Sequence, residues 1–360
     1  MNFKATYTLQ KFRLRSSSLE TFVIDDDVPV TMILRRPTEE ELSHGFEQDV
    51  TFCEAYAHIA PNDKTLKVFN DIESGAVRGT PEEYTIGYKD SSGEMVYLPK
   101  QLPNYLTDFI ARTSQVLSRA VNRLVNLVRW RTDAYGSHRV LATKGIGGLE
   151  WSRDTKHWYP APTGFSVHFE QVHIERTVGA AEKQEISALL QEKADAPLHH
   201  EMFREAWHQR LANPRSAIIM GMASLEIAVK YCIGKLVPNA QWLAENVPSP
   251  PVILILKEML PTLPAVCSLP VGAVMLPDQI ERKLKNGVSI RNSLAHAGKF
   301  TLQIDSLEEI LNSVKDILWL VDFLCGQVWA YNYIRKGTRE AMEANIASTA
   351  SLHADNTGGE

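Results

Sequence analysis

The period of the hydrophobic residues changes along this chain, and that change limits the folds it can adopt. Near the N-terminus Phe3, Ala5, Tyr7 and Leu9 alternate with polar neighbours, the period-two pattern of a strand with one buried face. Beyond about Gly179 the apolar residues recur almost entirely at helical spacing. The sequence therefore predicts an α+β domain over residues 1–178, an all-α helical bundle over 179–337 and a flexible polar tail over 338–360.

The first domain carries no motif that identifies a function. We expect strands in residues 1–36, a hairpin formed by residues 84–88 and 94–98, one long amphipathic helix over 104–130, and a further strand-like run at 165–174. A domain of this kind is expected to recognise a ligand or a protein trigger that the sequence does not identify.

Four arginines near the end of that long helix lie beside an aromatic residue. A basic face with an aromatic ring can hold RNA, but a solvated helix face is the simpler interpretation. The residues are Arg119, Arg123, Arg129 and Arg131, with Trp130.

The second domain should consist of helices joined by one long connector. We expect helices at 182–193, from about 197, at 215–235 after the start signal Asn213-Pro214, from Pro277-Asp278 towards Gly298, and at 306–334. Residues 236–277 contain eight prolines, so they are expected to form a connector with one short helix at 252–259.

Composition indicates a soluble globular protein, and we expect it in the cytoplasm. Of the 360 residues 44% are hydrophobic and 22% are charged. The formal net charge of -5 argues against broad electrostatic binding of nucleic acid, although it leaves room for a local basic patch. The most apolar stretch, residues 217–233, is interrupted by Glu226 and Lys230, so we expect a buried helix there and not a membrane span.

No metal or other cofactor is expected. The four cysteines are scattered without CxxC spacing, which suits a reducing compartment and argues against a structural zinc site. His199, His200 and Glu201 with His208 resemble a ligand set at first. Because His200 and His208 are eight residues apart and no carboxylate completes the set, a solvated helix is the preferred interpretation.

Residues 291–298 read Arg-Asn-Ser-Leu-Ala-His-Ala-Gly and contain the candidate catalytic groups. Arginine presents a planar, permanently charged fork to phosphate oxygens, and histidine can accept or deliver a proton near neutral pH. Asn292 and His296 are four residues apart and share a helix face, whereas Arg291 lies about 140° away around the axis. A swinging arginine or a second copy of the chain would be needed to bring both groups to one phosphate.

This segment resembles the signature of the HEPN family: an Arg, then a polar residue that is often Asn, then a His after a short spacing. Small residues around His296 and the helix over residues 217–230 are also similar to that family. The resemblance covers about residues 180–337. One departure is Gly298, which stands where nucleotidyltransferase-linked HEPN toxins have a Tyr. A second Arg–His pair, Arg131 and His138, lacks the Asn and is set aside as a chance match.

The resemblance implies a homodimeric endoribonuclease with a composite active site at the dimer interface. It implies metal-independent RNA cleavage through the 2′-OH, giving a 2′,3′-cyclic phosphate and a 5′-OH, in a bacterial defence or toxin role. Arg291, Asn292 and His296 would be the catalytic residues, and Glu226 would brace Arg291 across the bundle. The alternative is a non-catalytic HEPN scaffold that binds a nucleotide or protein partner, in which Arg291 and His296 belong to an interfacial ion-pair network.

Overall fold

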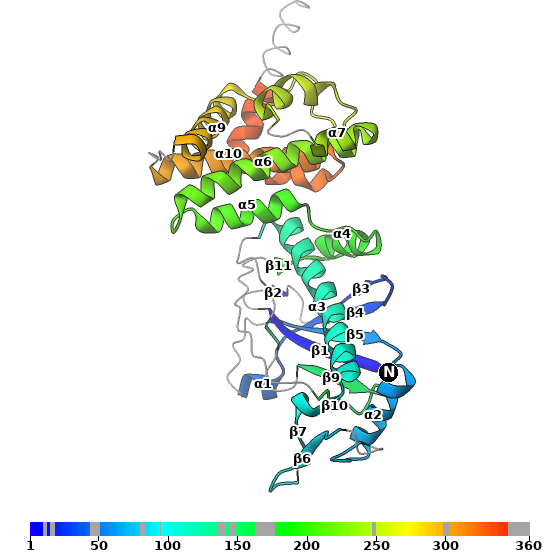
Figure 1. The fold of residues 1–360 in the computed structure, drawn as a ribbon. Helices are drawn as coiled ribbons and strands as arrows, with labels where there is room; N and C mark the ends of the chain where they lie inside the picture. Colours follow the sequence, from blue (N-terminus) through cyan, green and yellow to red (C-terminus); the bar gives the residue numbers. More distant parts are fainter. Residues whose placement is uncertain are drawn as a thin grey trace, which may run out of the picture. The chain divides into compact units, whose positions relative to one another are not determined.

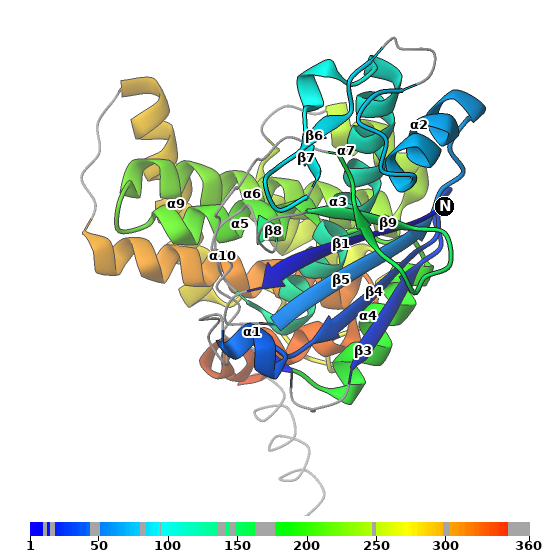
Figure 2. The same ribbon diagram turned by 90° about the horizontal axis from the view of Figure 1, so that it is seen from below.

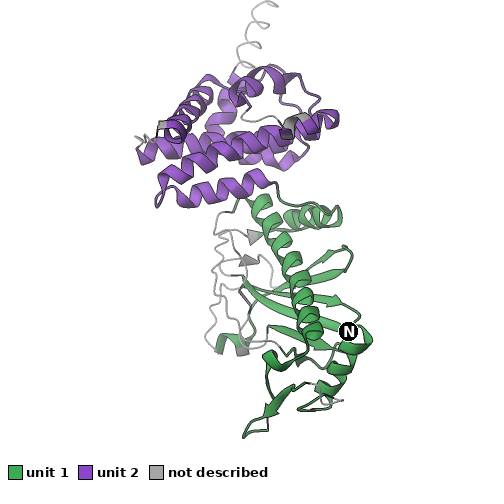
Figure 3. Ribbon diagram, in the orientation of Figure 1, with its two compact units in different colours: residues 1–196 green, residues 197–360 purple. Residues whose placement is uncertain are grey.

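The chain divides into two compact units, residues 1–196 and 197–360 (Figure 3). The computed structural model describes the chain except for residues 10–12, 15–18, 44–50, 80–83, 94, 135–141, 144–147, 163–176, 247–249, 298–302 and 345–360.

The first unit is built on an antiparallel sheet with strand order β10-β9-β1-β5-β4-β3, in which β8 also pairs with β1 (Figures 1 and 2). Phe3 lies opposite Ala57 of β5 and opposite Trp151 of β9. The expected alternation is confirmed, because Phe3, Ala5, Tyr7 and Leu9 are all buried. The strands are β1 (Asn2–Leu9), β3 (Glu20–Ile24), β4 (Val30–Arg35), β5 (Thr51–His58), β8 (Ala142–Thr143), β9 (Leu149–Ser152) and β10 (Tyr159–Pro160).

Helices α2 (Asp63–Glu73) and α3 (Asn104–Thr132) cover one face of this sheet (Figure 2). The ring of Phe3 lies 6.1 Å from that of Phe69 on α2 and 5.7 Å from that of Phe109 on α3. The long helix expected over 104–130 is confirmed. It ends at Thr132, and Asp133 caps it in the left-handed conformation with φ 52°.

Of the four arginines near the end of α3, Arg119 is exposed as a solvated face requires, but the end of the helix is not the solvated basic face that the sequence suggested. Arg129 is 1% exposed and Arg131 is 8% exposed, and Arg131 forms an ion pair with Glu185. Arg123 pairs with Asp26 and Asp195. These last three arginines are therefore engaged inside the first unit, and Arg129 and Arg131 are too buried to hold RNA.

The division between the units falls one helix later than the boundary expected near Gly179. Helix α4 (Ala180–Gln191) packs against α3 and β3, and it buries Ile186, Leu189 and Leu190. It therefore belongs to the first unit.

The remaining elements of that unit are short. β6 and β7 form the expected hairpin, β2 pairs in parallel with β11, and the strand-like run at 165–174 lies outside the described residues. Their bounds are β2 (Arg13–Leu14), α1 (Glu39–Ser43), β6 (Gly87–Lys89), β7 (Met95–Tyr97), η1 (Pro99–Gln101) and β11 (Thr177–Val178).

The second unit is a helical bundle arranged around α6 (Pro214–Leu236), which contacts α5, α9 and α10 (Figure 1). Asn213 caps α6 as the sequence predicted, because its side chain accepts the N–H of Ser216 at 3.2 Å. The other elements are α5 (Leu198–Gln209), η2 (Pro238–Ala240), α7 (Gln241–Asn246), α8 (Val252–Leu254), η3 (Ile255–Met259), η4 (Leu260–Thr262), α9 (Asp278–Ala297), α10 (Ile304–Leu324) and η5 (Val328–Tyr333).

Among the described helices, α6 alone is long and apolar enough to cross a membrane by length and composition. Its apolar window is 56% buried within the protein, and a core helix passes the same test.

The C-terminal part differs from the sequence-based expectation in two respects. α10 ends at Leu324 and not near residue 334, because Gly326 adopts φ 112°, which turns the chain out of the helix. The flexible tail was expected to begin at residue 338, but the folded part of the chain continues beyond that residue. Residues 336–344 are helical, Thr338 donates to Asp316 at 2.6 Å, and Met342 is fully buried. The last residues, 345–360, lie outside the described part of the chain.

Candidate active site

Helix α9 carries three of the four candidate residues, and its packing fixes where they lie. It buries Ile280 and Leu284 and passes close to α6 and α10 at Gly287. A Cβ at that glycine would stand 2.8 Å from both Ile310 and Met222, so a side chain there would push the helices apart. The small residue therefore lets α9 lie close against the bundle with its C-terminal half at the surface.

Arg291 is held by contacts on two sides. Its guanidinium forms an ion pair with Glu226 of α6, and it also donates to the side-chain oxygen of Asn292 at 3.1 Å. The side chains of Arg291 and Glu226 are 23% and 25% exposed, so the pair is only partly shielded from solvent. The contact expected between Glu226 and Arg291 is present. Because a guanidinium has five N–H donors, three remain for an anion.

His296 occupies the last turn of α9 with its side chain exposed. Within the described part of the chain it has no hydrogen-bond or ion-pair partner. An imidazole placed in this way is accessible to a substrate and to a second molecule of the protein.

All four candidate residues line one cleft of about 700 Å³ in the second unit. Glu226 contributes from α6, and Arg291, Asn292 and His296 contribute from α9. The offset of about 140° between Arg291 and His296 does not separate them, because Arg291 reaches across to α6. A cleft of this volume falls within the usual range of small-ligand sites. Its opposite wall comes from the proline-rich connector at residues 250–254, which the sequence did not indicate.

The arrangement can bind a phosphate group and move a proton. Arg291 supplies a fixed positive charge with free donors, and His296 supplies an ionisable nitrogen at the same cleft. Asn292 offers an amide N–H₂ as a further donor, since its oxygen accepts from Arg291. This combination suits phosphoryl chemistry without a metal ion.

A second cluster corrects the interpretation of His199 and His200 as parts of a solvated helix. They are 0% and 4% exposed, and both bind Asp322 of α10. The His199 Nε2 lies 3.2 Å from Oδ1 of Asp322, and the His200 Nε2 lies 2.7 Å from Oδ2. The sequence could not show this carboxylate, because it is 122 positions from His200 along the chain.

Burial lowers the pKa of His200 to about 4 despite the opposing attraction of Asp322. Burial by itself would raise the pKa of Asp322, but the two histidines outweigh it and lower that pKa. The carboxylate is therefore ionised and His200 neutral near pH 7. The three candidate ligand atoms lie within 4.8 Å of one another, which would suit a metal ion. Since each carboxylate oxygen already has a histidine partner, the cluster forms a buried link between α5 and α10, although Nδ1 of His199 is buried without a hydrogen-bond partner among the described residues.

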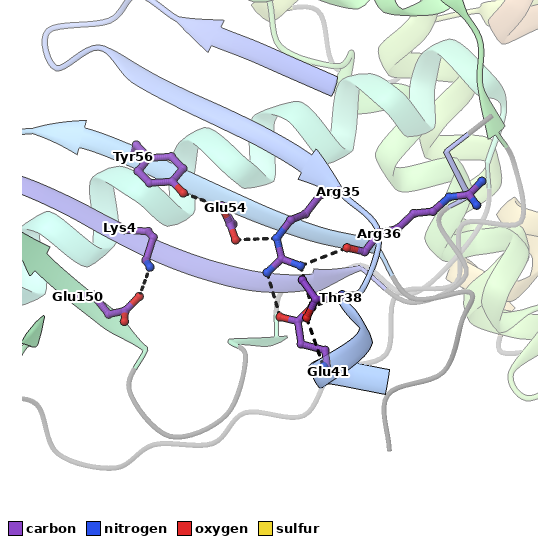
Figure 4. A network of polar contacts seen from close by, with 8 residues as sticks. All are labelled: Lys4, Arg35, Arg36, Thr38, Glu41, Glu54, Tyr56 and Glu150. Atoms are coloured by element: carbon purple, nitrogen blue, oxygen red, sulfur yellow. Dashed lines mark hydrogen bonds and ion pairs between the residues drawn. The ribbon is translucent and has the colours of Figure 1, made fainter. Parts of the chain in front are cut away.

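A polar network on the sheet of the first unit was also not expected (Figure 4). Arg35 binds Glu41 at 2.7 Å and Glu54 at 2.7 Å, and Tyr56 donates to Glu54 at 2.6 Å. The bonds to Glu41 and Glu54 raise the pKa of Arg35 although burial opposes them. One guanidinium is paired with two carboxylates, so this group keeps a negative formal charge. It links β4, β5 and α1 and is the weaker candidate for a phosphate site.

A comparison of the chain with family models, with curated proteins and with solved structures found no match.

Proposed function

We propose that the second unit is a HEPN-type endoribonuclease that cleaves RNA without a metal ion, with a bacterial defence or toxin role. The observation that carries this proposal is the gathering of Arg291, Asn292 and His296 in one cleft, with Arg291 anchored by Glu226. The helical architecture around α6 and α9 is compatible with it. The first unit would then recognise the trigger or ligand.

In the proposed reaction the ribose 2′-OH loses its proton to an imidazole while its oxygen attacks the adjacent phosphorus. The bond from phosphorus to the 5′-oxygen breaks, and that oxygen receives a proton, so a 2′,3′-cyclic phosphate and a 5′-OH remain. Arg291 stabilises the negative charge on the crowded phosphorus centre. Because one His296 cannot act as base and acid in the same step, a homodimer with two copies of the motif supplies both groups.

The exposed surface of α9 supports such a dimer. Asn292, Ser293, Ala295 and His296 are all exposed, and Ser293 and Ala295 are small, so a second α9 can approach closely. The composite site would bring one Arg291–His296 set from each protomer to the same phosphate.

The alternative is a non-catalytic scaffold that binds a nucleotide or a protein partner through the same cleft. The ion pair between Arg291 and Glu226 favours it, because an arginine already neutralised by a carboxylate has less attraction for phosphate. A growth test separates the two functions. Overexpression of an active ribonuclease arrests the host and H296Q relieves the arrest, whereas a scaffold gives the same growth with either protein.

The decisive experiment uses synthetic single-stranded RNA, the full chain and an excess of EDTA. We expect cleavage to continue and the products to carry a 2′,3′-cyclic phosphate and a 5′-OH. A 2′-deoxy substitution at the cleaved position should block the reaction, because DNA-like sugars lack the nucleophile. Activity that disappears with EDTA and returns with Mg²⁺ or Mn²⁺ would show a metal nuclease and contradict the proposal.

A further inference from the structure

The cleft that contains Arg291 and His296 extends well beyond them along α9. Glu281, Lys285, Val288, Asn292 and His296 all line it. They follow one another at intervals of three or four residues and so form one stripe of the helix. From the first to the last the helix rises about 22 Å, so the cleft is longer than a single phosphate requires.

The far end of this stripe holds a second cationic position. The Glu281 carboxylate accepts from Lys257 of η3 at 3.0 Å and from Lys285 at 2.7 Å. Glu281 is only 8% exposed, whereas Lys257 and Lys285 are 53% and 60% exposed. The buried carboxylate thus gathers two accessible ammonium groups at one point.

Both lysines keep donors for another anion. An ammonium has three N–H donors; Lys257 donates to both oxygens of Glu281 and Lys285 pairs with one, so each lysine keeps at least one donor. The hydrogen bond to Glu281 raises the pKa of Lys257, and the hydrogen bonds from Lys285 and Lys257 lower the pKa of Glu281. Counted with Glu281 alone, the two ammonium groups leave one positive charge in excess, but Glu258 and Asp278 also act on Lys257 and raise its pKa. A phosphate can bridge the two lysines through their remaining N–H donors.

The wall of the cleft that faces α9 is apolar. It includes Pro250, Pro251, Val252, Ile253 and Leu254, and Met222 and Val288 add apolar surface from α6 and α9. Lys285 and Arg291 are six residues apart on α9, about 9 Å of helix rise, and both side chains are long and flexible at their ends. A nucleoside can therefore lie against this wall while the phosphates on either side of it meet the two cationic positions.

We propose that this cleft binds single-stranded RNA across two consecutive phosphates, the scissile one at Arg291 and His296 and its neighbour at Lys257 and Lys285. This inference rests on the proposed function, since it extends the substrate site of the same reaction. The intervening base packs on the apolar wall, which requires it to be splayed out of any duplex. Among the described lining residues no Phe, Tyr or Trp ring is present to stack on the base, so little base preference is expected at this position.

The charges of the cleft set the strength of this binding. Lys257, Lys285 and Arg291 face three acidic residues, Glu226, Glu258 and Glu281, so the formal charges of the lining balance. Attraction for phosphate is therefore local to the two cationic positions. For a single strand that makes two phosphate contacts, a plot of the logarithm of the binding constant against the logarithm of the salt concentration should have a slope of about -1.4.

The test separates binding from cleavage. The probe for binding is a fluorescent 2′-deoxy tetranucleotide, which cannot react, and its affinity is measured by anisotropy over a range of salt concentrations. The cleft variant is K257Q/K285Q, because glutamine still donates to Glu281 but carries no charge. The matched control is R282Q/K283Q, which removes two charges from α9 outside the residues that line the cleft.

We expect the cleft variant to bind the probe about tenfold more weakly and to reduce the salt slope by about 0.7, the share of one phosphate contact, while the control binds like the wild type. With RNA, the wild type should cleave a dinucleotide that carries an extra terminal phosphate about tenfold faster than one without it. The cleft variant should cleave both at the slower rate.

The outcomes distinguish the two proposals. If the wild type cleaves RNA but the cleft variant binds and cleaves like the control, the second phosphate position is wrong and the ribonuclease stands. If no RNA is cleaved but the cleft variant alone loses affinity for the probe, the ribonuclease is wrong and the second phosphate position stands. Equal binding by all three proteins, whatever the cleavage, overturns the inference.

Discussion

Replacing His296 with glutamine should abolish RNA cleavage and leave the protein folded. The side chain is exposed and has no partner among the described residues, so the free energy of unfolding should change by no more than about 0.5 kcal/mol. Loss of a general acid or base costs about 10²–10⁴-fold in rate, which corresponds to roughly 3–5 kcal/mol of transition-state stabilisation. The effect on activity should thus exceed the effect on stability several-fold.

Arg291→Ala should give a similar loss of rate with a larger but still modest loss of stability. Its ion pair with Glu226 is partly exposed on both sides, and pairs of that kind contribute up to about 1 kcal/mol. The assay is the initial rate on fluorescent RNA together with urea unfolding followed by circular dichroism.

The controls for these two variants are residues of the same type outside the cleft. His208 on α5 and Arg282 on α9 are both exposed, so H208Q and R282A should cleave at the wild-type rate. Arg131 is a poor control, because it is buried and paired with Glu185. Wild-type activity in H296Q would refute the assignment of the site, and the scaffold function would then be preferred.

Two further predictions concern assembly and acid stability. Light scattering at micromolar concentration should show that the wild type is a dimer. Ser293→Arg, on the exposed surface of α9, should convert the dimer to an inactive monomer. A wild-type protein that is monomeric and fully active would contradict the composite site. Stability should fall as the pH drops from about 6.5 to 4, because unfolded His200 binds a proton there that the buried side chain, with its pKa of about 4, does not. The loss, on the order of a few kcal/mol, should be much smaller in H200Q when urea unfolding is measured across that range.

Local signals in the sequence located the helices that carry the candidate site. The pairs Asn213-Pro214 and Pro277-Asp278 predicted the starts of α6 and α9 to within about one residue of their observed bounds. Both signals act through neighbouring residues alone: a side chain that caps an N–H group, and a proline whose missing N–H costs nothing at a helix start. The lone carboxylate Glu226 in an apolar helix likewise pointed to a charged partner across the bundle, which is the partly exposed Arg291.

Features that depend on distant residues could not be predicted. Strand β5 was missed because Thr51, Phe52 and Cys53 are all buried in succession, so no alternation appears at its start. The role of His199 and His200 depends on Asp322 from the last long helix. For the connector at residues 250–254 the only signal in the sequence was its prolines. Its position in the cleft beside α9 follows from packing of the whole bundle.

Packing in the bundle brings the side chains of Arg291 and His296 to one cleft, although the two residues point to different sides of α9. An offset of about 140° would direct the two side chains away from each other if α9 were isolated. Glu226 draws the guanidinium towards α6, and its neighbours Leu225 and Val229 are fully buried, so this anchor is rigid. The distance between α6 and α9 is in turn limited by Gly287, which leaves no room for a Cβ. The position of the Arg291 guanidinium is therefore determined by packing in the core and not by the motif alone. For the same reason an Arg and a His at a similar spacing but without this bundle, such as Arg131 and His138, do not by themselves indicate a site.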